Sequence, residues 1–207
     1  QPPGRLGSLH QTAALIESDL ARATERLRVT FPRYAELMAP APIDVSAAQD
    51  LLRPDEALVS FLALDDRLLV WFLRPGRPLV YRDQGHKRGD LTALVRRVRS
   101  SLDQTGNSNL AAGHLSAFDV AGAHRLYDLL IDPIAADLVG VKHLIVVPDD
   151  VLLPVPFGVL VTRAEGEAYE RLSDLHARGA ELTPGDLGAY AHLSWLASEY
   201  AITVLPS

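Results

Sequence analysis

Short apolar runs, separated by proline, glycine and acidic residues, divide most of the chain into brief elements. The clearest run covers residues 144–147, is rich in β-branched side chains and ends at Pro148. Such a run predicts a strand buried on both faces, at the centre of an α/β sheet. The polar pair Asp149-Asp150 follows, and a second apolar segment then reaches the step Pro156-Phe157. We interpret the stretch 143–160 as the central strand of the domain and the turn at its carboxyl end.

Upstream, apolar segments separated by tight polar turns predict an antiparallel meander. Residues 57–64 and 67–74 flank the polar turn Asp65-Asp66 and form a predicted hairpin, and a third strand is predicted over residues 78–82. Helices are predicted over residues 44–52, 90–103 and 118–131, and another begins at Asp132-Pro133. Asp90 is the expected N-cap of the second helix. With a last strand at 199–205, this order of elements predicts an α/β layer fold.

The amino-terminal segment has a different pattern from the rest of the chain. Apolar residues recur over residues 6–30 with alternating spacings of four and three, which is a heptad seam: Leu9, Ala13, Ile16, Leu20, Ala23 and Leu27. Ala39-Pro40-Ala41-Pro42 then resembles a linker. We therefore divide the chain into an amphipathic helix at 1–42 and a domain at 43–207. The helix either docks a partner or preceding helical domain, through Leu9, Ile16, Leu20 and Leu27, or packs on its own domain.

Composition narrows the classes of function. A hydrophobic content of 48% supports a buried core, and the net charge of −6 argues against a general nucleic-acid binder. We expect no membrane span and no secretory signal, and the absence of Cys makes the cytoplasm the default compartment. The first residue is not Met, which suggests a fragment or a processed product. The chain contains no Cys and therefore has no thiol nucleophile or thiolate metal site of its own.

Few residues suggest chemistry. Asp149-Asp150, at the carboxyl end of a buried strand, could bind a metal or small molecule or act as acid and base; the alternative is turn and cap chemistry. The basic stretch is either an anion site or a solvated helix face: Arg82, Lys87, Arg88, Arg96, Arg97 and Arg99. The seven His residues show no zinc spacing, and no nucleotide-binding or hydrolase-elbow motif is present. We assign no catalytic, cofactor or metal residue.

Residues 148–160, PDDVLLPVPFGVL, resemble the Pro-Asp-Gly-x-Leu-x-x-x-Pro-Phe-x-x-Leu signature of CHAT domains, the caspase-like domains associated with tetratricopeptide repeats. Residues 54–58, 126–133 and 198–207 resemble further family segments in the same order. The resemblance spans about residues 43 to 207. It implies a caspase-like α/β/α sandwich with a mixed, largely parallel sheet, of which this chain holds the amino-terminal part.

The resemblance also implies a His-Cys dyad on later strands, with thiolate attack on a peptide carbonyl. This chain ends at the Pro-Ser step before those positions, so no catalytic residue is carried over. The expectation is an amino-terminal fragment of a CHAT-family peptidase, whose partners are the remainder of the domain and, for the full-length protein, a protein substrate. The alternative is a non-catalytic CHAT-like interaction or regulatory module. Residues 162–193 are longer than the usual connection and suggest an insertion.

Overall fold

The computed structural model describes residues 15–16, 18–19, 22–23, 25–26, 29–31, 44–103 and 115–205. The chain divides into two compact units, Gln1–Asp44 and Val45–Ser207. In the first unit Ile16 and Ala23, two positions of the predicted heptad seam, are helical and exposed. The other four positions, Leu9, Ala13, Leu20 and Leu27, lie outside the described residues. The proposed docking role of this helix therefore stays a prediction.

The second unit contains a five-stranded mixed sheet in the order β3-β2-β1-β4-β5. The strands are β1 Glu56–Ala63, β2 Leu68–Leu73, β3 Val80–Gln84, β4 His143–Val147 and β5 Ala201–Val204. The first three form the antiparallel meander, and β4 and β5 add to β1 in parallel. The α/β fold and the meander are confirmed. The third strand begins two residues later than predicted, because its pairing with β2 starts at Val80, opposite Phe72.

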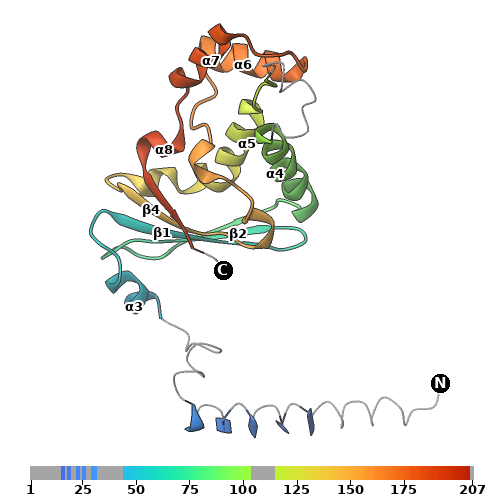
Figure 1. The fold of residues 1–207 in the computed structure, drawn as a ribbon. Coiled ribbons are helices and arrows are strands. Elements are labelled where there is room, and N and C mark those ends of the chain that lie inside the picture. The colour runs from blue at the N-terminus through green and yellow to red at the C-terminus, as the bar shows by residue number, and fades with distance from the viewer. Residues whose placement is uncertain are drawn as a thin grey trace, which may run out of the picture. The chain divides into compact units, whose positions relative to one another are not determined.

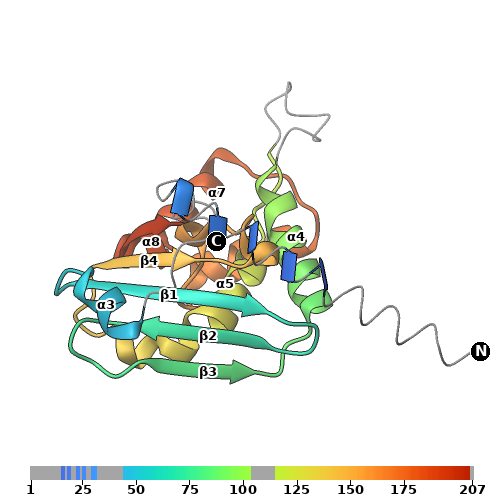
Figure 2. The same cartoon turned by 90° about the horizontal axis from the view of Figure 1, so that it is seen from below.

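Helices lie mainly on one side of the sheet (Figure 1). They include α4 Arg88–Leu102, α5 Val120–Leu130, the 3-10 helix η2 Asp132–Leu138 and α8 Leu196–Glu199. The short α3, Val45–Asp50, lies on the opposite side, near the meander (Figure 2). Within residues 44–103 and 115–205, the second helical layer of the expected sandwich therefore consists of α3 alone.

The side chains of β4 show the consequence of this one-sided cover. Leu144 and Val146 face the helices and are fully buried, whereas His143, Ile145 and Val147 are only half-buried. The prediction that β4 is buried on both faces is therefore wrong for the described residues. An apolar run reports that both faces avoid charge, but it does not reveal whether a second layer covers them.

The core lies between the sheet and the helices. Alternate residues of β1, such as Val59 and Phe61, meet the buried stripes of α4 and α5, including Val95 and Leu126. The cap of α4 differs from expectation, and the cap of α5 was not predicted. Lys87, not Asp90, precedes the first turn of α4, and Asp119 caps α5 by accepting a hydrogen bond from the Gly122 N–H. None of the helices in the described part of the chain is long and apolar enough to cross a membrane.

The segment 162–193 forms a lobe at the end of the helical layer far from the sheet (Figure 1). It contains α6 Glu167–Ala177, α7 Pro184–Ala189 and the 3-10 helix η5 Tyr190–His192. The carboxylate of Asp186 completes a capping box with Thr183 and accepts a 2.6 Å hydrogen bond from Arg171 Nε. These hydrogen bonds, from Thr183 first, lower the pKa of Asp186 to about 2. The ionised Asp186 carboxylate therefore stabilises the fold fully at pH values above its ordinary pKa, and this stabilisation is lost as the pH falls towards 2.

Candidate functional site

The acidic pair Asp149-Asp150 lies at the carboxyl end of β4 and fastens the end of β1. An Asp149 carboxylate oxygen accepts a 2.9 Å hydrogen bond from the Ala63 N–H, and Arg88 donates to the Ala63 carbonyl at 2.7 Å. Arg88 also pairs with Asp150 at 2.6 Å. Asp149 therefore caps a backbone N–H group, as expected, but this group belongs to the neighbouring strand β1. The Asp149 side chain makes no cap hydrogen bond within its own turn. No cluster suited to a metal ion occurs among the residues that the structure describes.

The basic stretch predicted from sequence does not form one patch. Arg82 pairs with Asp137, Arg88 with Asp150, and Arg97 with Asp119. These three guanidinium groups form ion pairs within the fold, at separate places. Arg96 and Arg99 differ: both are exposed, and within the described ranges neither forms an ion pair.

Arg96 and Arg99 line one groove, between α4 and the 3-10 helix η3, Asp150–Leu152. The groove has a volume of about 560 Å³, and a hollow of about 470 Å³ adjoins it, sharing Thr92 and Arg96. The groove is lined by Thr92, Val95, Arg96, Arg99, Ser100, Asp103, Asp150, Val151 and Pro154. It lies beside the carboxyl ends of β1 and β4, the edge at which α/β domains place their binding sites.

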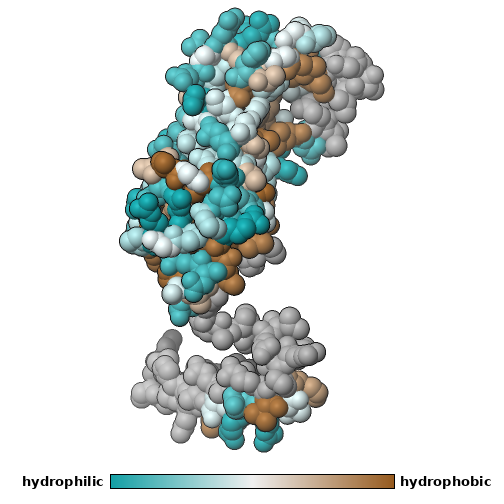
Figure 3. All heavy atoms as spheres, turned by 90° about the vertical axis from the view of Figure 1, so that its left-hand side faces the viewer, coloured by the Kyte–Doolittle hydropathy of each residue, from teal (hydrophilic) through white to brown (hydrophobic). Residues whose placement is uncertain are grey.

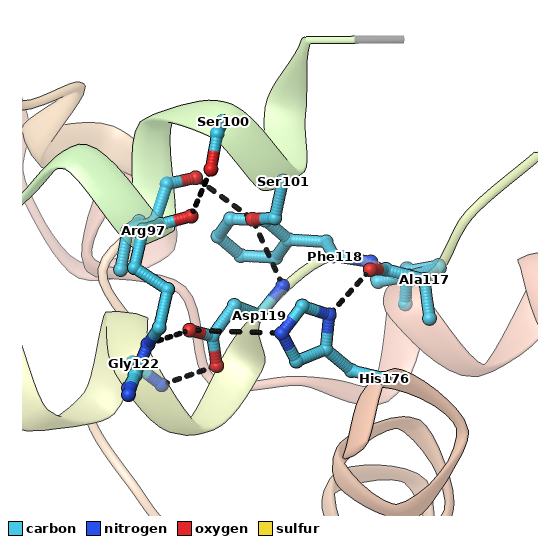
Figure 4. A network of polar contacts seen from close by, with 10 residues as sticks. Arg97, Ser100, Ser101, Ala117, Phe118, Asp119, Gly122 and His176 are labelled. Atoms are coloured by element: carbon cyan, nitrogen blue, oxygen red, sulfur yellow. Dashed lines mark hydrogen bonds and ion pairs between the residues drawn. The ribbon is translucent and has the colours of Figure 1, made fainter. Parts of the chain in front are cut away.

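On another side of α4, a buried carboxylate organises the polar network of Figure 4. Asp119, 2% exposed, accepts hydrogen bonds from the Gly122 N–H at 2.8 Å and from Arg97 Nε at 2.6 Å. The Ser101 hydroxyl accepts a hydrogen bond from the Asp119 N–H at 3.1 Å. His176 of α6 donates from Nδ1 to the Ala117 carbonyl at 2.8 Å, and its Nε2 lies 3.8 Å from Asp119. The network therefore joins α4, the start of α5 and the 162–193 lobe.

A second network lies at the opposite, amino-terminal edge of the sheet. His143 bridges the Glu56 carboxylate, 2.9 Å from Nδ1, and the Thr203 hydroxyl, 2.8 Å from Nε2. Arg53 holds Glu56 through its backbone N–H and its guanidinium, each at 2.8 Å. The hydrogen bond from the Arg53 backbone, aided by the one from His143, lowers the pKa of Glu56 against the opposing effect of burial. The order hydroxyl, imidazole, carboxylate is that of a triad, but here the three groups stand on adjacent strands and tie β1, β4 and β5 together.

Figure 3 shows the molecule from the left-hand side of Figure 1, where apolar residues form small clusters among hydrophilic ones.

The Pro-Phe step is part of the core. Phe157 opens the 3-10 helix η4, Phe157–Val159, is 1% exposed, and stacks on Phe61 of β1 with the ring centroids 6.1 Å apart. Leu160 is also fully buried, and its carbonyl accepts a hydrogen bond from the Leu196 N–H of α8. The segment after β4 therefore returns beneath the helices to anchor the chain before β5.

Residues 120–207 match the family model of the CHAT domain. The match begins at α5 and includes β4, the Pro-Phe step and β5, so it confirms the resemblance for this part of the chain. No curated protein matched the sequence. Among solved structures, a "PilM-PilN type IV pilus biogenesis complex" is similar with 15% identity and a TM-score of 0.22, over 72% of this chain and 39% of that one. At that TM-score the likeness carries no argument.

The CHAT match includes the Pro-Phe step but assigns no chemistry to these residues. Two networks were missed by sequence reasoning, because their members are far apart in the chain: Arg97, Asp119 and His176 in one, and Glu56, His143 and Thr203 in the other. One signal was available for the first. Asp119 precedes an apolar helix and is followed three residues later by glycine, which is compatible with a tight N-cap. For the groove, the spacing of Arg96 and Arg99 on one helix face was the available signal.

Proposed function

We propose that this chain is the amino-terminal part of a CHAT-family, caspase-like cysteine peptidase whose His-Cys dyad is supplied by sequence beyond Ser207. The observation that carries the proposal is the CHAT match over residues 120–207. The chain itself contains no Cys, so the thiolate must come from elsewhere in the parent protein.

The sheet supports this proposal. Its parallel strands β1, β4 and β5 point the same way, so further parallel strands added beside β5 would present their carboxyl ends at the edge where Asp149 and Arg88 lie. In such a sheet this is the edge at which reacting groups gather. The half-buried Ile145 and Val147 on the second face would be covered by the remainder of the domain. The amino-terminal helix would connect to helical repeats.

The parent reading frame tests the proposal first. We expect it to encode a strand ending in His and another ending in Cys after residue 207, and a helical repeat region before residue 1. The full-length protein, with and without its Cys changed to Ala, is then incubated with a mixed peptide library, and cleavage is followed by mass spectrometry. Cleavage by the Cys form alone supports a peptidase. A frame without His or Cys at such positions overturns it.

A non-catalytic CHAT-like interaction module is the second candidate, and the open sheet face favours it. Trp71, Leu62 and Ile145 share that face and are half-buried or exposed within residues 45–205. A surface of this kind is typical of a protein-binding site. A parent frame with degraded His or Cys positions, together with a stable complex that Leu62→Glu abolishes, would favour this candidate over the peptidase.

A further inference from the structure

The α4–η3 groove combines an apolar floor with unpaired positive charge. Val95 is buried and Val151 half-buried, and Pro154 closes the floor beside them. Arg96 and Arg99 stand at the rim, three residues apart on one helix face. The volume of about 560 Å³ is within the range of sites that bind ligands. The groove can therefore hold several side chains rather than a lone ion.

The balance of charge in the groove favours an acidic occupant. Asp150 is already neutralised by Arg88 at 2.6 Å, whereas Arg96 and Arg99 have no ion pair among the described residues. Asp103 lines the groove beyond Arg99 and sets a limit to the positive region. Two arginines that keep their full charge beside apolar surface are suited to bidentate pairing with carboxylates.

Spacing suggests the conformation of the occupant. Helix residues three apart are separated by about 4.5 Å along the axis, while alternate residues of an extended peptide are about 6.6 Å apart and point the same way. Long arginine side chains span this difference. A peptide that lies along α4 with acidic side chains towards Arg96 and Arg99 would turn the residue between them towards Val151 and Pro154.

We propose that the α4–η3 groove binds an extended protein segment in which acidic and apolar residues alternate, with Arg96 and Arg99 pairing with two of its carboxylates. A nucleic acid is the less suitable occupant, because the chain carries a net charge of −6 and the floor offers phosphate only apolar contacts. The proposal concerns recognition alone and does not depend on peptidase activity.

The test is fluorescence anisotropy of a labelled, end-capped octapeptide of alternating Glu and Leu against the full 207-residue chain. We expect saturable binding that weakens as salt rises and falls about tenfold in the double variant Arg96→Ala/Arg99→Ala, since each exposed ion pair contributes roughly 0.2–1 kcal/mol. The matched control, Arg77→Ala/Arg163→Ala, removes two charges outside the groove and should bind as the unchanged chain does. Circular dichroism verifies that both variants fold.

Several results would overturn the proposal. These are the absence of saturable binding, equal binding of the Gln–Leu octapeptide, an equal loss in the control variant, and tighter binding of an oligothymidylate of eight nucleotides. A second variant, Val151→Glu, places a carboxylate on the floor without touching either arginine and should also weaken binding. If Val151→Glu folds and binds unchanged, the peptide lies elsewhere.

Discussion

Two sides of α4 carry arginines that are neighbours in sequence but differ in role. Arg97 reaches the buried Asp119 at 2.6 Å, where it holds together α4 and α5 next to the 162–193 lobe. Arg96 and Arg99 are directed to the groove and pair with no described residue. A charged side chain that is paired within the fold contributes to stability. Removing an unpaired, exposed one changes stability little, and such a side chain remains available for a partner.

The largest effect is expected from Asp119→Ala. It removes the N-cap of α5, leaves the Gly122 N–H and the Arg97 guanidinium without their acceptor, and removes the carboxylate that lies 3.8 Å from His176 Nε2. We expect a loss of about 2–4 kcal/mol in the free energy of unfolding, from the lost cap and from breaking a pair with a buried carboxylate. Urea denaturation followed by circular dichroism measures it.

Asp119→Asn serves as the control for shape, since it keeps an acceptor for the cap but loses the charge opposite Arg97. Its free energy of unfolding should lie between that of the unchanged chain and that of Asp119→Ala. If both variants unfold at the same urea concentration as the unchanged chain, the network does not hold the helices together.

Gly122→Ala should have the next largest effect. A Cβ at this position would stand 2.3 Å from the Asp119 carboxylate and 2.8 Å from Val98 Cγ2, so the cap or the α4 contact must shift. We expect a loss of about 1–3 kcal/mol, as for overpacked cores, although alanine ordinarily favours a helix over glycine. Gly188→Ala, in α7 where nothing lies within 4 Å of the added Cβ, is the matched control. A destabilisation equal in the two variants would contradict the crowding at Gly122.

The difference between these regions was only partly predictable from sequence. Two apolar segments around the polar turn Asp65-Asp66 predicted the β1–β2 hairpin, and helical periodicity predicted α4 and α5 to within two residues. Local patterns suffice there because each element is defined by neighbours in the chain. The turn Asp149-Asp150 was correctly placed at the end of β4, but its bond to Ala63 could not be predicted, since 86 residues separate the two partners.

The candidate site depends still more on distant parts of the chain. Arg96 and Arg97 are indistinguishable in sequence, and their roles separate only when Asp119 and Val151 arrive from different sides of α4. Likewise, the apolar run of β4 does not reveal that one of its faces is left half-buried. Residue type and spacing thus indicate which groups can act, and the tertiary arrangement decides which of them are already in use.

The last pair of variants separates the two arginines directly. Arg97→Ala removes a charge-assisted hydrogen bond to a carboxylate that is 3% exposed, which then remains buried without its strongest partner. We expect it to cost about 1–3 kcal/mol in the free energy of unfolding. Arg96→Ala, one residue away on the same helix, removes an exposed side chain and should change it by no more than about 0.5 kcal/mol. Urea denaturation of the two variants side by side makes the comparison. Equal losses would show that the pairing of Arg97 adds nothing to stability, and the distinction between the structural and the binding side of α4 would then have no energetic basis.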